Sequence, residues 1–318
     1  MSATQILTVT LNPALDITTS VSRVVPRLKL RCGPPRYDAG GGGVNVSRAI
    51  KELGGTSRAF IVLGGANGAQ YRDILSSTDL ESEIWEGEGE TRFSLTVMED
   101  ETGDHYRFLL PGPPHEAIEA DRVLAAVTRS LESGIRFVVA SGSLPPGFPV
   151  DFYARLTRAA QATAAAMIVD SSGPALAATF KEKPYCIRMN HHEAIELLGG
   201  GDDAKPEDLA HKLVSTEAAQ VAIVTIGDQG AVVATPARWF RVPSPKVEVR
   251  SPVGAGDSFV GALTLGLSRG WSLEDASRLG VAAAASAVTT EATELCKRES
   301  TEQYFADIVA EGPERVRG

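Results

Sequence analysis

The sequence predicts an α/β fold with a doubly wound, mostly parallel sheet and helices on both faces. Three observations predict it. Short strands such as residues 137–140 and 221–226 are apolar on both faces, which suits a sheet covered on both sides. After residue 114 these strands alternate with stretches of helical periodicity. Glycine-bearing turns follow several strands, where ligands bind in such sheets.

The first part of the chain begins with core elements. Residues 6–11 predict a buried strand that ends at Asn12-Pro13. The glycines at 40–43 precede a helical pattern, and residues 60–63 predict a second core strand followed by a short polar helix. These segments begin the α/β alternation.

Two segments interrupt that alternation. Residues 16–37 are broken by prolines and glycine, which is typical of edge strands outside a main sheet. Residues 91–110 contain two alternating runs around an acidic turn, which indicates a hairpin. We therefore expect one domain over residues 1–318, with a small β-sheet lid formed by about residues 15–39 and 91–111.

The second half of the chain alternates regularly. The pattern predicts helices at about 119–132, 151–165, 191–198, 206–216, 256–268 and 273–290. It predicts strands at about 136–140, 167–170, 185–189, 221–226, 231–235 and 245–250.

Composition restricts the partners. The formal net charge of -9 argues against extended contact with nucleic acid or an anionic membrane, while an anionic small molecule can still bind at local cations. The three cysteines are few and far apart, which argues against structural zinc and favours a reducing compartment. The sequence shows neither a signal peptide nor a membrane span, so we expect a cytoplasmic protein.

The segment SPVGAGDSFVG, residues 251–261, is the chemically most suggestive one. It is predicted to join the strand at 245–250 to the helix at 256–268. Unpaired backbone amides of Gly254, Ala255 and Gly256 could bind an anion at the helix start, while Asp257 reaches a hydroxyl. Alternatively, the glycines allow tight packing and Asp257 caps the helix. The motif alone does not separate these interpretations.

Several earlier polar groups fit a sugar ligand, and each has a structural alternative. Gly41 and Gly42 allow close approach of a polyhydroxyl ligand, and Asn45 can donate and accept hydrogen bonds, although a flexible turn also explains the glycines. Asp16 could bind sugar hydroxyls or form an Asx-turn. Ser141 could contact a phosphate or sugar oxygen, or belong to a rigid Pro-Pro-Gly turn.

Basic residues on the predicted lid are candidate phosphate ligands. Lys29, Arg31, Arg92 and Arg107 each lie among alternating residues, where a single basic side chain is usually just solvated. Together they could bind a phosphate group.

Two later segments are candidates for the nucleotide side. Asn190 and Glu193 are spaced as a helix capping box, and the same spacing would let Glu193 hold a water on Mg²⁺. The segment TIGDQG, residues 225–230, could border a nucleotide or form a hairpin.

Taken together, the motifs resemble those of the ribokinase-like (PfkB) sugar kinases, and within them the 6-phosphofructokinases. The matching segments cover nearly the whole chain in order: LNPALD, KLRC, GGGGVNVSRAI, TRFSL, HYRF, SGSLPPG, VDSSG, TIGDQGA, SPVGAGDS and ELC. The glycine run lacks the lysine that is typical of fructose-1-phosphate and tagatose-6-phosphate kinases.

The resemblance implies ATP and Mg²⁺ as cosubstrates, and a homodimer joined through the lids. It implies that Asp257 is the general base and that the amides of residues 254–256 form an anion hole for the transferring phosphoryl group. The sugar side would consist of Asp16, Gly41, Gly42 and Asn45, with Lys29, Arg92 and Ser141 on the existing phosphate and Arg31 contributed by the partner subunit. The nucleotide side would consist of Arg188, Asn190, Thr225, Gly227 and Gly230, with Glu193 at the metal.

The chain departs from the family pattern on the nucleotide side. Arg188-Met189-Asn190 replaces Lys-Pro-Asn, and a planar guanidinium is not equivalent to a lysine ammonium. Ala292 and Glu294 replace an expected glycine and arginine, which weakens the case for a K⁺ site.

The sequence therefore predicts an ATP-dependent sugar-phosphate kinase, with fructose 6-phosphate as the first candidate substrate. A tagatose-6-phosphate or fructose-1-phosphate kinase is the nearest alternative. An alternative of another class, motivated by Arg188 and Glu294, is a catalytically weak sugar-phosphate sensor.

Overall fold

The computed structural model describes residues 4–201, 203–291 and 293–311. Its main sheet contains nine strands in the order β13-β12-β11-β10-β9-β8-β1-β4-β5. These are β1 (Ile6–Thr10), β4 (Arg58–Leu63), β5 (Glu81–Glu86), β8 (Phe137–Ser141), β9 (Ala166–Asp170), β10 (Cys186–Asn190), β11 (Val221–Thr225), β12 (Ala231–Ala234) and β13 (Trp239–Val242). Neighbouring strands pair in parallel along this order from β11 through β10, β9, β8, β1 and β4 to β5. The strands β12 and β13 are added to the β11 edge in antiparallel pairing. The predicted mostly parallel sheet is confirmed.

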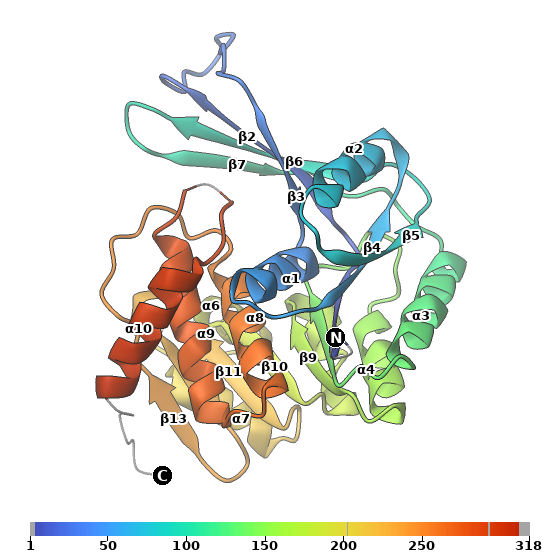
Figure 1. The fold of residues 1–318 in the computed structure, drawn as a ribbon, viewed down its shortest axis with the longest axis vertical. Helices are drawn as coiled ribbons and strands as arrows, with labels where there is room; N and C mark the ends of the chain where they lie inside the picture. The colour runs from blue at the N-terminus through green and yellow to red at the C-terminus, as the bar shows by residue number, and fades with distance from the viewer. Residues whose placement is uncertain (1–3, 202, 292, 312–318) are drawn as a thin grey trace.

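Helices cover both faces of this sheet (Figure 1). One face packs against α3 (Ala117–Leu131), α4 (Phe152–Ala162), α5 (Gly173–Ala177), α6 (His191–Leu198) and α7 (Pro206–Ser215). The other packs against α1 (Gly42–Glu52), α8 (Ala255–Ser268), α9 (Leu273–Val288) and α10 (Arg298–Glu311), while α2 (Gly65–Ser76) packs over β4. Short 3-10 turns lie at Phe180–Glu182 and Gly227–Gln229.

Alternating residues of the strands divide between the two faces. Val138 of β8 packs among the α3–α7 helices, and its neighbour Val139 packs with α1, α8 and α9. This alternation explains why the strands are apolar throughout, since each side chain is buried under one helical layer or the other.

A second sheet projects from the core (Figure 1). It has the order β3-β2-β6-β7, with β2 (Ala14–Val21), β3 (Arg36–Gly40), β6 (Arg92–Glu99) and β7 (His105–Leu109). The strands β6 and β7 form the antiparallel hairpin expected around the acidic turn. We call this four-stranded unit the small sheet.

One predicted strand is wrong. Residues 245–250 form no strand, and β13, which the sequence analysis missed, lies earlier in the chain. Pro243 and Pro245 have no amide hydrogen to donate to a sheet. The backbone N–H groups of Arg250 and Ser251 donate instead to the carbonyl of Val288 in α9. The alternation of Val247 and Val249 was therefore misleading, and an irregular segment precedes α8.

Within its described ranges, the chain has no helix that is long and apolar enough to cross a bilayer.

Candidate active site

The start of α8 presents Asp257 without using it as a cap. Gly254 is the N-cap residue and has a left-handed backbone (φ 77°), a conformation that favours glycine, and no side chain caps the helix. The amide of Ser258 donates to the carbonyl of Gly254, which begins the hydrogen bonding of the helix. The capping interpretation of Asp257 is therefore wrong, and its carboxylate is available for other contacts.

Side chains from two other elements meet that carboxylate. Nδ2 of Asn45, in the first turn of α1, donates to Oδ2 of Asp257 at 2.9 Å. Oγ of Ser141, the last residue of β8, lies 3.5 Å from Oδ1 of Asp257 and 3.0 Å from Oδ2 of Asp170. Because a hydroxyl has one proton to donate, Ser141 is shared between two carboxylates.

This arrangement changes the acidity of Asp257. Burial, and after it the nearby negative charge of Asp170, raise the pKa of Asp257 from its ordinary value to about 7. Asn45, Arg188 and Ser141 oppose the shift by stabilising the charged form. Burial outweighs these groups, so the carboxylate is poised to take up a proton near neutral pH.

Arg188, in β10, links the ends of the two neighbouring strands β9 and β11. Its Nη1 donates to Oδ1 of Asp170 at the end of β9 (3.1 Å), and its Nη2 donates to Oγ1 of Thr225 at the end of β11 (2.8 Å). A Cβ on Gly256 would lie 2.6 Å from Nη1 of Arg188, so a side chain there would displace the guanidinium from its present position. The Nε atom of Arg188 is buried and has no hydrogen-bond partner in the described part of the chain. An anion could satisfy that donor.

Asp170 is a site residue that the sequence analysis did not single out. It contacts both Ser141 and Arg188 and raises the pKa of Asp257. The available indication was its place at the carboxyl end of a predicted strand, directly before the turn Ser171-Ser172-Gly173.

The glycine run brings the start of α1 against neighbouring strand ends. A Cβ on Gly42 would lie 2.2 Å from Oγ of Ser141, and one on Gly40 would lie 1.9 Å from Oδ2 of Asp16. Gly41 has φ 127°, and its Cβ would approach Thr10 to 2.7 Å. The run is therefore a close-packed junction, which differs from the flexible turn considered above.

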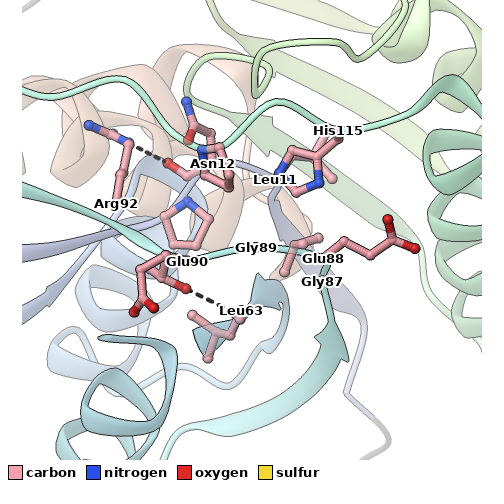
Figure 2. Close-up of a pocket in the computed structure, with 14 residues that line it drawn as sticks. Leu11, Asn12, Leu63, Gly87, Glu88, Gly89, Glu90, Arg92 and His115 are labelled. Atoms are coloured by element: carbon pink, nitrogen blue, oxygen red, sulfur yellow. Dashed lines mark hydrogen bonds between the residues drawn. The ribbon is translucent and has the colours of Figure 1, made fainter. Parts of the chain in front are cut away.

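Asp16 and Arg92 lie on neighbouring strands of the small sheet. Burial raises the pKa of Asp16 to about 6, and the charges of Arg92 and Arg107 oppose this shift. Nε of Arg92 donates to the backbone carbonyl of Asn12 at 3.2 Å, as Figure 2 shows. Burial lowers the pKa of Arg92, while Asp16 favours its charged form.

Lys29 and Arg31 lie apart from this group. Both are exposed on the connection between β2 and β3. Neither makes a hydrogen bond or ion pair with another candidate residue within the described part of the chain.

The nucleotide-side candidates follow the strand ends β10 and β11. Asn190 and Glu193 form the predicted capping box: Oδ1 of Asn190 accepts from Glu193 N at 2.9 Å, and Oε2 of Glu193 accepts from Asn190 N at 2.8 Å. Residues 225–230 form the hairpin alternative, since β11 and β12 are antiparallel. Gly227 is exposed, whereas a Cβ on Gly230 would lie 2.0 Å from the carbonyl oxygen of Val242.

The altered segment near the C-terminus is only partly described. Ala292 lies outside the described residues. Glu294 forms ion pairs with Arg36 of β3 (3.6 Å) and with Lys297 (3.1 Å), and these cations lower its pKa.

The doubly wound sheet, the second small sheet and a buried acid at a glycine-rich helix start define a ribokinase-like carbohydrate kinase. Residues 9–300 match the pfkB family carbohydrate kinases, and the chain belongs to that family. The predicted family is therefore confirmed.

Among its relatives, the chain is 41% identical over 312 residues to ATP-dependent 6-phosphofructokinase isozyme 2 of Mycobacterium tuberculosis, which covers 98% of this chain and 91% of the relative. It is 31% identical to 1-phosphofructokinase of Bacillus subtilis, covering 95% of this chain and 98% of the relative. It also resembles solved structures of Escherichia coli phosphofructokinase-2. The complex with potassium has a TM-score of 0.91 at 36% identity, and the complex with fructose-6-phosphate has a TM-score of 0.89 at 35% identity; each comparison covers 96% of this chain and 99% of the other.

The raised pKa of Asp257 predicts an acid limb in the pH dependence of kcat/KM. If Asp257 acts as a base, only its ionised carboxylate can accept a proton, so activity should fall as pH decreases through about 7. Asp170→Asn removes a neighbouring negative charge, which lowers the pKa of Asp257 and should move the limb to lower pH. Steady-state kinetics over the neutral range test this, with the exposed Asp79→Asn as control. An unmoved limb in Asp170→Asn would exclude the electrostatic coupling.

Proposed function

We propose that this chain is an ATP-dependent 6-phosphofructokinase, which transfers the γ-phosphoryl group of ATP to the 1-hydroxyl of fructose 6-phosphate. The observation that supports it most is the carboxylate of Asp257, with its pKa raised to about 7, at the start of α8. The named activities of the relatives at 41% and 36% identity support the choice of substrate.

In the proposed reaction, Asp257 accepts the proton of the sugar hydroxyl as that oxygen attacks the γ-phosphorus, and ADP leaves. Asn45 holds one oxygen of the carboxylate, which fixes its orientation. The amides of Gly254, Ala255 and Gly256 precede the first helical hydrogen bond and form the anion hole for the transferring group. Positioning and charge stabilisation account for most catalysis of phosphoryl transfer.

On the sugar side, Asp16, Gly41, Gly42 and Asn45 bind hydroxyl groups. Arg92, Lys29 and Ser141 bind the existing phosphate. Ser141 must turn its hydroxyl away from Asp170 and Asp257 to make that contact. We propose that the small sheet acts as a lid over this site, within a single kinase domain.

On the nucleotide side, Arg188, Asn190, Thr225, Gly227 and Gly230 border ATP. The unpartnered Nε of Arg188 fits an anionic ligand. Glu193 fits Mg²⁺ through a bound water, because one carboxylate oxygen caps α6 and a carboxylate has a second to offer. Magnesium would neutralise phosphate charge. The ion pairs of Glu294 argue against a K⁺ requirement, which the assay below examines.

Two alternatives make different predictions. A fructose-1-phosphate or tagatose-6-phosphate kinase would prefer its own sugar in a substrate panel, and the Bacillus subtilis 1-phosphofructokinase motivates the first. A sugar-phosphate sensor would bind sugar phosphate in isothermal titration without binding ATP or forming product.

We also propose that the enzyme acts in the cytoplasm.

Asp257→Asn tests the proposed function directly. Replacing the base should reduce kcat by ~10²–10⁴-fold while leaving the fold intact. A coupled assay with Mg²⁺ and ATP, with and without K⁺, should compare fructose 6-phosphate, tagatose 6-phosphate, fructose 1-phosphate and free fructose. Circular dichroism verifies folding, and the exposed Asp79→Asn is the control.

Equal turnover by the Asp257→Asn variant would remove Asp257 from the base role. A higher kcat/KM of the wild type for another sugar would replace fructose 6-phosphate as substrate.

We further propose that two copies join through their small sheets. The strand register aligns Tyr37, Ile17, Leu95 and Phe108 as one apolar row across all four strands. Tyr37 and Phe108 are 40% and 53% exposed, and contiguous exposed apolar side chains mark interaction surfaces. The exposed Arg31 could then complete the partner's site.

Leu95→Glu at the centre of this row should convert the dimer into a monomer, because it would bury an unpaired charge in the interface. Sedimentation equilibrium measures the mass. Thr96→Glu, which lies on the opposite face, is the matched control and should stay dimeric. A wild type that is monomeric, or a Leu95→Glu variant of unchanged mass, would contradict this interface.

A further inference from the structure

Four short segments connect the small sheet to the rest of the chain: those between β1 and β2, β3 and α1, β5 and β6, and β7 and α3. A buried pair of side chains contacts the last two. The chain leaves the core between β5 and β6, at residues 87–91, and returns between β7 and α3, at residues 110–116. Glu119, in the first turn of α3, and His115 lie between these two connections. Their side chains are 3% and 5% exposed, and neither has a role in the reaction proposed above.

Glu119 uses both carboxylate oxygens on the two connections. Oε1 accepts the backbone N–H of Glu88 at 2.9 Å, in the outgoing connection. Oε2 lies 2.7 Å from Nδ1 of His115, in the returning connection. A carboxylate bonded to neighbouring groups on two segments fixes their separation, and its burial makes the loss of either bond costly.

The returning connection also contacts the loop that follows Ser141, at the end of β8. The backbone N–H of His115 donates to the carbonyl of Pro146 at 2.8 Å, and its ring packs edge-on against Phe148. A Cβ on Gly147 would lie 2.0 Å from the carbonyl oxygen of His115, so only glycine permits this approach.

The outgoing connection leads directly to Arg92. The backbone N–H of Thr91 donates to the carbonyl of Gly64, and its hydroxyl accepts from Gly64 N at 2.9 Å. Arg92 follows and donates to the carbonyls of Asn12, between β1 and β2, and of Leu110, so it contacts one further connection and the start of the returning one. The cavity among these segments, drawn in Figure 2, measures about 20 Å³, which is room for about one water and too small for a sugar.

We propose that Glu119 and His115 are positioning residues. They hold the two connections at residues 87–91 and 110–116 in place and thereby position Arg92 against the substrate phosphate. The kinetic part of this inference rests on the proposed function. The anchoring itself concerns the free protein and does not depend on which sugar is phosphorylated.

Two variants of Glu119 separate anchoring from packing. Glu119→Ala removes both bonds. Glu119→Gln keeps an acceptor for Glu88 N and offers a donor to Nδ1 of His115, so it should retain the anchor. Glu116→Ala is the control, because Glu116 is exposed at the start of the same helix and makes no side-chain cap bond.

In hydrogen–deuterium exchange of the free protein, Glu119→Ala should speed exchange at residues 87–92 and 110–116 by ~10-fold over Glu116→Ala. In kinetics, it should raise KM for the sugar phosphate by ~10-fold or more, with the KM for ATP within about twofold, because misplacement affects the phosphate contact. Glu119→Gln should resemble the wild type in both.

Unchanged exchange in a folded Glu119→Ala would overturn the anchor. If Glu119→Ala does not fold, His115→Ala takes its place in both measurements, with the same expectations. Faster exchange with unchanged KM for the sugar would overturn the placement of Arg92. A wild type that phosphorylates none of the sugars would instead refute the proposed function, and the exchange result would still stand.

Discussion

The burial of two carboxylates beside one hydroxyl is the constraint on which the site depends. Asp257 and Asp170 meet at Ser141, and in a partly desolvated site two like charges repel. Arg188 and Asn45 compensate part of that cost, yet burial still dominates and raises the pKa of Asp257 to about 7. The surrounding backbone is fitted to this cluster, since a Cβ at position 42 would meet the backbone beside Ser141, and one at position 256 would displace the guanidinium of Arg188.

The topology explains why these groups converge. From β1 the sheet extends to β4 and β5 on one side, and to β8 and its successors on the other. Ser141 and Asp170 end adjacent strands, and the start of α1 packs against the ends of β1 and β8. This is a switch point, where parallel sheets bind ligands. The small sheet adds a polar row containing Asp16 on one face and an apolar row containing Leu95 on the other, so one unit can serve both substrate and a second copy.

Features that depend on residues adjacent in the sequence could be predicted from the sequence. The glycine-rich helix start with Asp257, the capping box of Asn190 and the hairpin after residue 91 all depend on neighbouring residues. The strand at 245–250 was wrong because the prolines nearby outweighed the alternation of Val247 and Val249. Asp170 and Glu119 were missed because their importance comes from partners far along the chain, such as Ser141 and Glu88. Lys29 and Arg31 matched the family motif, but a single chain leaves them exposed.

The environment of Asp257 should make its carboxylate a base near neutral pH. Carbon-13 NMR of aspartate-labelled protein, with Asp257→Asn to assign the signal, measures the carboxyl titration of Asp257 in the free enzyme. We expect a midpoint at about 7. A midpoint near the ordinary aspartate value of about 3.9 would contradict it, because burial and Asp170 would then have no effect on the proton affinity of this group.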